Sequence, residues 1–252
     1  MSTMKTLCLL AVVVAGCAAS EPTLGTTESH VETENRLATN RLATNRLATN
    51  RLATNGLSEV SSIDDLKAMA SDDGGRELLT YMISCALPEG QSLTVETDSG
   101  TYTFDGLIGL APNWTTTPLS LEDRRWVSAC LLARVNYYGV TVHISMRGDS
   151  PALAITSEEG ADYPLYEGAF WGDLFADGTQ DKNACISAYK ATDPQVGDMP
   201  LRQCTVPTGD GTTWCDFTAA GTCEDVCSGL DGENGFTTCA GASQVINVFL
   251  QN

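Results

Sequence analysis

The positions of the cysteines constrain the fold of this chain more than any other feature of the sequence. Two of the ten cysteines, Cys8 and Cys17, lie near the N-terminus, and the other eight are Cys85, Cys130, Cys185, Cys204, Cys215, Cys223, Cys227 and Cys239. An even number of cysteines in an exported chain is typical of a disulfide framework, whereas cysteines of a cytosolic chain more often bind metal or react. The compartment of the chain therefore decides how the eight sulfurs are interpreted.

The N-terminus has the pattern of an export signal. Lys5 supplies a positive charge, and an apolar run of nine residues follows from Leu7 to Ala15. This length is typical of a cleaved signal peptide, because a membrane-spanning helix needs about 20 apolar residues. We therefore expect the chain to leave the cytoplasm and the eight later cysteines to pair as disulfides.

The end of this signal resembles the lipobox of bacterial lipoproteins, since Val14 to Cys17 reads Val-Ala-Gly-Cys. The resemblance implies removal of residues 1–16, diacylation of the Cys17 thiol and acylation of the new amino terminus. Each buried methylene contributes about 0.8 kcal/mol, so two or three acyl chains hold a protein firmly on a membrane. Ala18 instead of Asp follows the cysteine, a pattern that resembles lipoproteins sent to the outer membrane. An ordinary secretory signal with cleavage nearby is the alternative.

A repeat follows the expected anchor. Residues 35–55 contain four copies of Arg-Leu-Ala-Thr-Asn, preceded by an Asn. A period of five fits neither one face of a helix nor one face of a strand. It resembles pentapeptide repeats, which form a four-sided β-solenoid, although Asn and Arg stand where those repeats favour a small residue and Asp or Asn. We expect residues 17–56 to be a flexible tether with a span on the order of 35 Å, and the folded part to begin near Leu57.

The charge of the chain limits its partners. The sequence has 32 acidic and 14 basic residues, giving a formal net charge of −18. Such a chain repels nucleic acid phosphates and anionic lipid head groups. Cations such as Ca²⁺ and basic partners remain compatible with it, as does a simple contribution of the charge to solubility.

The folded part shows the patterns of an α+β protein, with helices and a hairpin in residues 57–166 and short strands in residues 167–252. A capping-box pattern begins at Ser120, and Gly74 and Gly75 are expected to interrupt the helical pattern. The expected elements are helices over 61–70, 76–87 and 121–138, a hairpin of 92–96 with 101–104, and strands over 140–146, 152–156 and 245–250. We expect two or three helices on a small antiparallel sheet, followed by a disulfide-stapled, loop-rich β region that shares the same core.

The pairing of the cysteines follows in part from these elements. Cys85 and Cys130 lie on apolar faces of expected helices, so we expect them to form one bridge. The six cysteines after residue 180 lie within 55 residues and are expected to form a local set of three bridges. The alternative for Cys223 and Cys227 is half of a zinc site, which needs a second pair of ligands. A redox-active Cys-x-x-Cys motif is absent.

Acidic turns are the candidates for a cation site. The segments 177–181 and 231–235 place carboxylates close to glycines, as Ca²⁺ ligands often are. The candidate ligands are Asp177, Asp181, Asp231 and Glu233. Neither segment matches an EF-hand loop, and the alternative is that both are ordinary acidic turns. No other cofactor is expected.

The candidates for catalysis and for ligand binding are weaker. His143 is the only histidine after residue 57, and no Gly-x-Ser-x-Gly motif exists to accompany it. Carboxylate pairs suited to glycoside hydrolysis could come from Glu158, Glu159, Asp162, Glu167, Asp173 and Asp177. A sugar-stacking or partner-binding surface could form from Trp114, Trp171 and Trp214, with Phe170, Tyr163 and Tyr166 near Trp171. The alternative for the aromatic residues is a small hydrophobic core.

Most of the chain resembles a wider group of proteins for which no activity is established. The lipobox, the repeat, the turn at Cys85 to Pro88 and the helix at Trp126 to Cys130 look like those of uncharacterised lipoproteins of myxobacteria-type bacteria. The sequence therefore favours a membrane-anchored envelope lipoprotein that is a non-catalytic binding or structural module for a glycan or an envelope protein. An exported hydrolase that acts on polysaccharide with carboxylate acid and base is the alternative.

Overall fold

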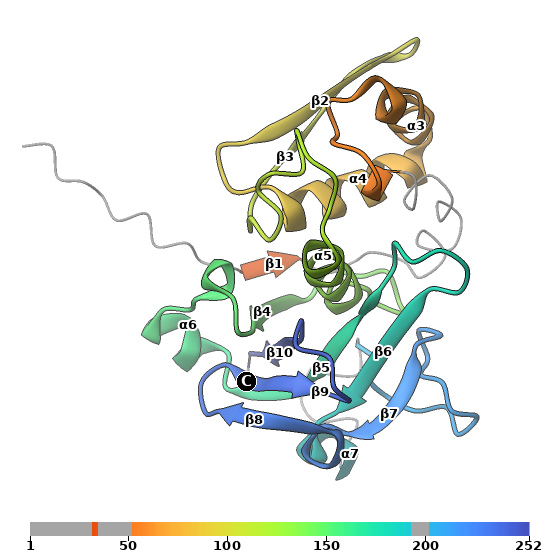
Figure 1. Cartoon of the computed structure of the whole chain (residues 1–252). Helices are drawn as coiled ribbons and strands as arrows, with labels where there is room; N and C mark the ends of the chain where they lie inside the picture. The colour runs from red at the N-terminus through yellow and green to blue at the C-terminus, as the bar shows by residue number, and fades with distance from the viewer. Residues whose placement is uncertain (1–31, 35–51, 193–201, 252) are drawn as a thin grey trace, which may run out of the picture.

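The computed structural model describes residues 32–34, 52–192 and 202–251 (Figure 1). The expected signal, Cys17 and most of the repeat lie outside the described residues. No helix in the described ranges is long and apolar enough to cross a membrane.

The structure confirms an α+β fold. The helices are α3 (Val60–Ser71), α4 (Asp73–Ala86), α5 (Leu121–Ala133), α6 (Ser157–Asp162), α7 (Ala188–Thr192) and α8 (Cys223–Val226), with a 3-10 turn η1 (Pro151–Leu153). The strands are β1 (Glu32–Glu34), β2 (Ser92–Thr97), β3 (Gly100–Asp105), β4 (His143–Arg147), β5 (Leu165–Asp173), β6 (Asp181–Ile186), β7 (Thr218–Thr222), β8 (Cys227–Asp231), β9 (Gly235–Cys239) and β10 (Ile246–Leu250).

The central sheet is larger than the sequence predicts, and it is mixed rather than antiparallel. Its strand order is β1-β4-β10-β5-β6-β7, and β6 and β7 are its parallel pair. The last strand, β10, lies in the middle of this sheet, where Val248 faces Met146 of β4 on one side and Gly168 of β5 on the other. The two halves of the chain are therefore joined in one sheet, and the C-terminus is part of the core.

The two faces of the sheet bury different sets of side chains. Phe170 of β5 belongs to the main core with the helices α3, α4 and α5, and in Figure 1 α5 lies between the sheet and the other two helices. Its neighbours Ala169 and Trp171 belong to a second cluster with Phe236 of the β8–β9 hairpin. Side chains alternate between the two faces of a strand, which explains why consecutive residues of β5 enter different clusters.

The first two helices follow one another more closely than expected. Asp72 alone separates α3 from α4, and its carboxylate accepts a hydrogen bond from Gly75 N at 2.8 Å. Gly75 is buried against the backbone of Met69, where a Cβ atom would clash with the Met69 oxygen. The predicted break between the two helices is confirmed at Asp72, but the second helix begins at Asp73 instead of Arg76, so Gly74 and Gly75 lie within α4, where glycine allows the two helices to pack closely.

The third helix begins as expected and ends early. Ser120 and Asp123 form the capping box, but α5 ends at Ala133 and not near Tyr138. The chain turns at Asn136 instead of continuing the helix. The Asn136 side chain donates a hydrogen bond to Val140 O and accepts one from Tyr138 N, both at 2.9 Å. An Asn side chain that bonds nearby backbone competes with helix formation.

Two of the expected strands also differ from the structure. The first is shorter, because β4 covers His143–Arg147, and Ser145 on its expected polar face is fully buried. The second, over 152–156, is wrong, because η1 and the cap of α6 occupy this segment. The β2–β3 hairpin is confirmed within one residue at each end.

All eight cysteines form disulfides, and the expected grouping is confirmed. The helix-to-helix bridge joins Cys85 of α4 to Cys130 of α5, and both residues are fully buried. The six remaining cysteines pair locally as Cys185–Cys223, Cys204–Cys215 and Cys227–Cys239.

The packed part of the chain starts earlier than Leu57, the expected boundary. Leu52 and Ala53, from the last copy of the repeat, are 0% and 2% exposed, and the Leu52 carbonyl accepts a hydrogen bond from the Trp114 indole at 3.2 Å. Upstream, β1 pairs with β4 within the segment expected to be tether. The five-residue period of the repeat does not indicate that one of its leucines is buried in the core.

Candidate functional site

Three aromatic side chains lie together on the surface. Tyr137, Tyr138 and Trp214 are 45%, 52% and 48% exposed. The ring centroids of Tyr137 and Tyr138 are 5.1 Å apart and those of Tyr137 and Trp214 are 5.5 Å apart, both in edge-to-face geometry. We call these three residues the aromatic surface. Large exposed apolar groups that gather in one place commonly mark a binding site.

The two tyrosines owe their position to the early end of α5. Because the chain leaves the helix after Ala133 and turns at Asn136, Tyr137 and Tyr138 project outward from a turn. The bonds of the Asn136 side chain to Val140 O and Tyr138 N hold this turn. The same interaction that ends the helix therefore presents the tyrosines.

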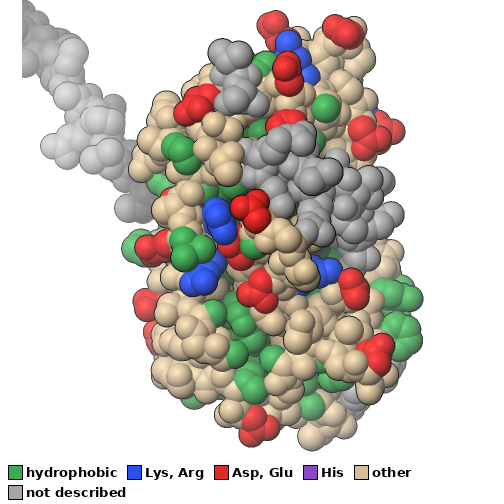
Figure 2. Space-filling model, turned by 45° about the vertical axis from the view of Figure 1, so that its right-hand side comes forward, with side chains coloured by type: hydrophobic (Ala, Val, Ile, Leu, Met, Phe, Trp, Pro, Cys, Tyr) green, Lys and Arg blue, Asp and Glu red, His purple; other side chains and the backbone are tan. Residues whose placement is uncertain are grey.

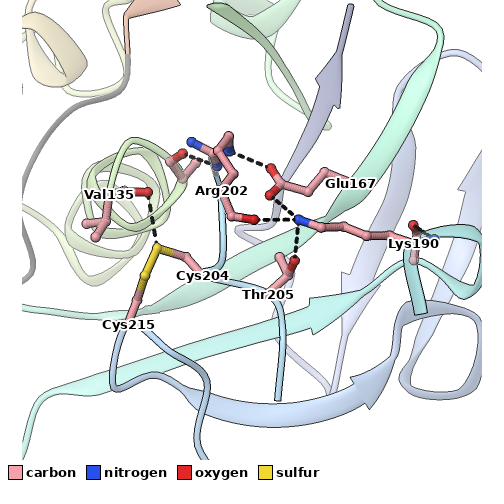
Figure 3. Close-up of polar contacts among 9 residues, drawn as sticks. Val135, Glu167, Lys190, Arg202, Cys204, Thr205 and Cys215 are labelled. Atoms are coloured by element: carbon pink, nitrogen blue, oxygen red, sulfur yellow. Dashed lines mark hydrogen bonds and ion pairs between the residues drawn. A yellow bond between two sulfur atoms is a disulfide. The ribbon is translucent and has the colours of Figure 1, made fainter. Parts of the chain in front are cut away.

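Trp214 reaches the same place from a disulfide-closed loop. The Cys204–Cys215 bridge closes a loop with a sequence separation of 11, and Trp214 N donates to Val206 O within it at 3.2 Å. The Cys204 sulfur lies 3.2 Å from the carbonyl oxygen of Val135 (Figure 3). The loop is therefore fixed against the segment that carries the tyrosines.

A fully buried ionic cluster lies at the start of this loop. Glu167 of β5 contacts Lys190 Nζ at 2.8 Å and Arg202 Nε at 2.7 Å, and all three side chains are almost inaccessible (Figure 3). Arg202 also donates to the carbonyl oxygen of Ala133, the last residue of α5, at 2.9 Å. The cluster thus joins the sheet, the end of α5 and the start of the loop that carries Trp214.

The three charged groups of this cluster influence one another's ionisation. Burial alone would raise the pKa of Glu167, but the charges and hydrogen bonds of Arg202 and Lys190 outweigh burial and lower that pKa. Burial lowers the pKa of Lys190, with Glu167 acting against this shift and Arg202 adding to it. A lowered pKa keeps Glu167 ionised, so this carboxyl group is a structural anion and is poorly suited to be a general acid.

Most of the aromatic residues that the sequence suggests for a binding surface are buried in the structure. Trp114 and Trp171 are 1% and 4% exposed, and Phe170 and Tyr163 are fully buried, so these four belong to the interior. Of the three tryptophans considered for a binding surface, only Trp214 is on the surface. The sequence does not single out Tyr137 and Tyr138, because the expected helix over 121–138 includes both of them.

The carboxylates considered for catalysis do not converge. Glu159 is buried and accepts a hydrogen bond from Ser145 at 2.7 Å, and Asp173 pairs with Arg124. Glu158 and Asp162 of α6 are exposed, as is Asp177 in the turn after β5. His143, at the start of β4, is exposed as well. Nothing in these positions assembles a nucleophile with a base.

The calcium candidates lie at two separate hairpin turns. Asp177 lies in the β5–β6 turn and Asp181 is the first residue of β6, whereas Asp231 is the last residue of β8 and Glu233 lies in the β8–β9 turn. Asp181 accepts from Asn183 at 2.7 Å and Asp231 accepts from Asn234 at 2.8 Å. Within the described ranges, no three acidic residues bring oxygens close enough together to share an ion.

The sulfurs of Cys185, Cys223 and Cys227 do lie within 4.8 Å of one another. They belong to two neighbouring disulfides, and the Cys185 and Cys227 sulfurs of different bridges are 3.7 Å apart. Zinc needs thiolates, which disulfides do not provide. The zinc alternative for Cys223 and Cys227 therefore does not describe the oxidised chain.

Comparisons with known proteins add no family. The chain shows no significant match to a protein-family model, to a curated protein or to a solved structure. The aromatic surface and its surroundings are therefore the basis on which a function has to be argued.

Proposed function

We propose that this chain is a lipid-anchored protein of the bacterial outer membrane whose folded part binds glycans through the aromatic surface, without catalysis. The observation that carries the proposal is the exposure of three aromatic rings, Tyr137, Tyr138 and Trp214, on backbone that a disulfide and a buried ionic cluster hold in place. Rigid presentation favours binding because little side-chain and loop freedom remains to be lost.

The chemistry of the surface favours sugars. Aromatic rings offer large, weakly hydrated faces, and the C–H groups of a pyranose ring carry the partial positive charge that such faces attract. The tyrosine hydroxyls add hydrogen-bonding groups at the edge of the surface. In Figure 2, acidic side chains are spread over the whole visible face, and the net charge of −18 repels polyanions. A neutral polysaccharide is therefore the expected ligand.

Replacing Trp214 by Ala is expected to weaken binding of a neutral polysaccharide by roughly 30-fold, the effect of losing about 2 kcal/mol at an aromatic hot spot. Affinity electrophoresis of the full-length chain in gels that contain soluble glucan, mannan or xylan measures this change. Tyr189→Ala is the matched control, because Tyr189 is also exposed, at 52%, but lies on α7 and has no ring contact with the aromatic surface among the described residues. The control is expected to migrate like the wild type.

Two results would reject glycan binding at this surface. One is that none of the neutral polysaccharides retards the wild-type chain. The other is that a retarded chain migrates unchanged when Trp214 is replaced. Circular dichroism of both variants shows whether the fold is retained, so that loss of binding is not confused with unfolding.

The anchor is tested separately. Cells given labelled palmitate are expected to transfer label to the wild-type chain and to lose all transfer in Cys17→Ser, because the lipobox resemblance makes this thiol the acylated group. Cys8→Ser, within the expected signal, is the control and should keep the label. An unlabelled wild-type chain, or label that survives in Cys17→Ser, contradicts lipid anchoring at this residue.

A further inference from the structure

A second, polar pocket lies at one end of the sheet, where the β5–β6 hairpin meets the turn after β9 and the first turns of α5. Its volume is about 330 Å³, near the lower end of the range for small-molecule sites. The lining residues are Arg125, Trp171, Gly172, Asp181, Asn183, Ala240, Gly241, Ala242 and Gln244. None of them belongs to the aromatic surface.

The polar groups of this pocket have capacity to spare. Arg125 is exposed and forms no ion pair in the described part of the chain, whereas its neighbour Arg124 is paired with Asp173. Asp181 uses one carboxylate oxygen to accept from Asn183 at 2.7 Å, and its other oxygen has no hydrogen bond among the described residues. The pocket therefore offers an uncommitted cation and an uncommitted acceptor from different elements.

The walls of the pocket are rigid backbone. At Gly172 a Cβ atom would clash with the backbone carbonyl oxygen of Asp181, so only glycine allows β5 and β6 to approach this closely here. The opposite wall is a tight turn in which Cys239 and Ala242 exchange two backbone hydrogen bonds of 2.9 Å, anchored by the Cys227–Cys239 bridge. Ala240 in this turn has φ of +48°, a conformation that costs energy for a residue other than glycine.

We propose that this pocket binds a small carboxylate that carries neighbouring hydrogen-bond donors, such as a uronic acid or an amino acid. Arg125 pairs with the carboxylate, because a guanidinium matches the two oxygens of a carboxylate geometrically. Asp181 accepts the hydroxyl or ammonium donors, and the Gln244 amide can serve either side of the ligand. The presence of both a cation, Arg125, and an anion, Asp181, in the lining favours such a ligand over a simple anion or a neutral sugar.

The test is calorimetric titration of the full-length chain with four probes: glucuronate, alanine, glucose and acetate. Glucuronate or alanine is expected to bind at least tenfold more tightly than glucose and acetate, and the preferred member of the first pair identifies the source of the carboxylate. Arg125→Gln is expected to weaken this binding at least tenfold. Lys67→Gln on α3 removes the same charge from an exposed site outside the pocket and is the matched control.

Three outcomes overturn the proposal: none of the probes binds, glucose binds as tightly as glucuronate and alanine, or Arg125→Gln binds like the wild type. Trp214→Ala is expected to leave binding of the carboxylate unchanged, because Trp214 is not part of this pocket. Failure of glycan binding at the aromatic surface and failure of this site are therefore separate results.

Discussion

Replacing Glu167 by Gln is expected to lower the free energy of unfolding by about 3–5 kcal/mol, because breaking a buried ion pair leaves uncompensated charge in the interior. Both cations that contact Glu167, Lys190 and Arg202, are fully buried and would lose the anion that balances them. Their remaining bonds go to uncharged oxygens, those of Ala133, Arg202 and Thr205. Urea unfolding followed by circular dichroism measures the change.

The control for this variant is Glu89→Gln, which removes the same charge from an exposed turn and is expected to change stability by less than about 0.5 kcal/mol. If Glu167→Gln does not fold, the triple variant Glu167→Leu, Lys190→Met and Arg202→Met removes all three charges and is expected to recover much of the loss. Equal unfolding midpoints for wild type and Glu167→Gln would show that the cluster is not a structural ionic group.

The same cluster predicts how stability depends on pH. The pKa of Glu167 is lower in the folded chain than in the unfolded chain, so its contribution is fully present above the unfolded pKa of about 4.3. The contribution disappears as the pH falls through the lowered, folded-state pKa. The stability difference between wild type and Glu167→Gln should therefore narrow as the pH falls below about 4.

Local patterns in the sequence predicted local structure well. The capping box at Ser120, the β2–β3 hairpin and the bridge between Cys85 and Cys130 all depend on neighbouring residues or on helix faces, and all three are present. The central place of β10 depends on pairing with strands far away in the chain, which no local period encodes. For the same reason the contact between Glu167 and Arg202 was not foreseen.

The aromatic surface was predicted only in part, and its physical cause explains why. Trp214 was a candidate, but Trp114 and Trp171 were grouped with it because sequence does not show which large rings the core needs. Tyr137 and Tyr138 were assigned to a helix, although Asn136 and Gly139 on either side of them are residues that favour a turn. If Asn136 and Gly139 are taken to end the helix, the sequence predicts that the two tyrosines lie in an exposed turn.

The second large effect concerns the disulfides, which are expected to separate stability from binding. Replacing Cys85 and Cys130 by Ala removes a bridge with a sequence separation of 45, for which loop entropy predicts a loss of about 4 kcal/mol. Replacing Cys204 and Cys215 by Ala opens a loop with a separation of 11, with a predicted loss of about 3 kcal/mol. Urea unfolding under non-reducing conditions measures both.

Binding is expected to follow the opposite order. The Cys85–Cys130 bridge joins two helices inside the core, so a variant without it that still folds should keep the geometry of the aromatic surface. The Cys204–Cys215 bridge holds Trp214 against the segment of Val135, so its loss should reduce polysaccharide retardation about as much as Trp214→Ala does. Equal loss of binding in both variants would mean that binding follows global stability. In that case the disulfide loop would have no specific part in presenting Trp214.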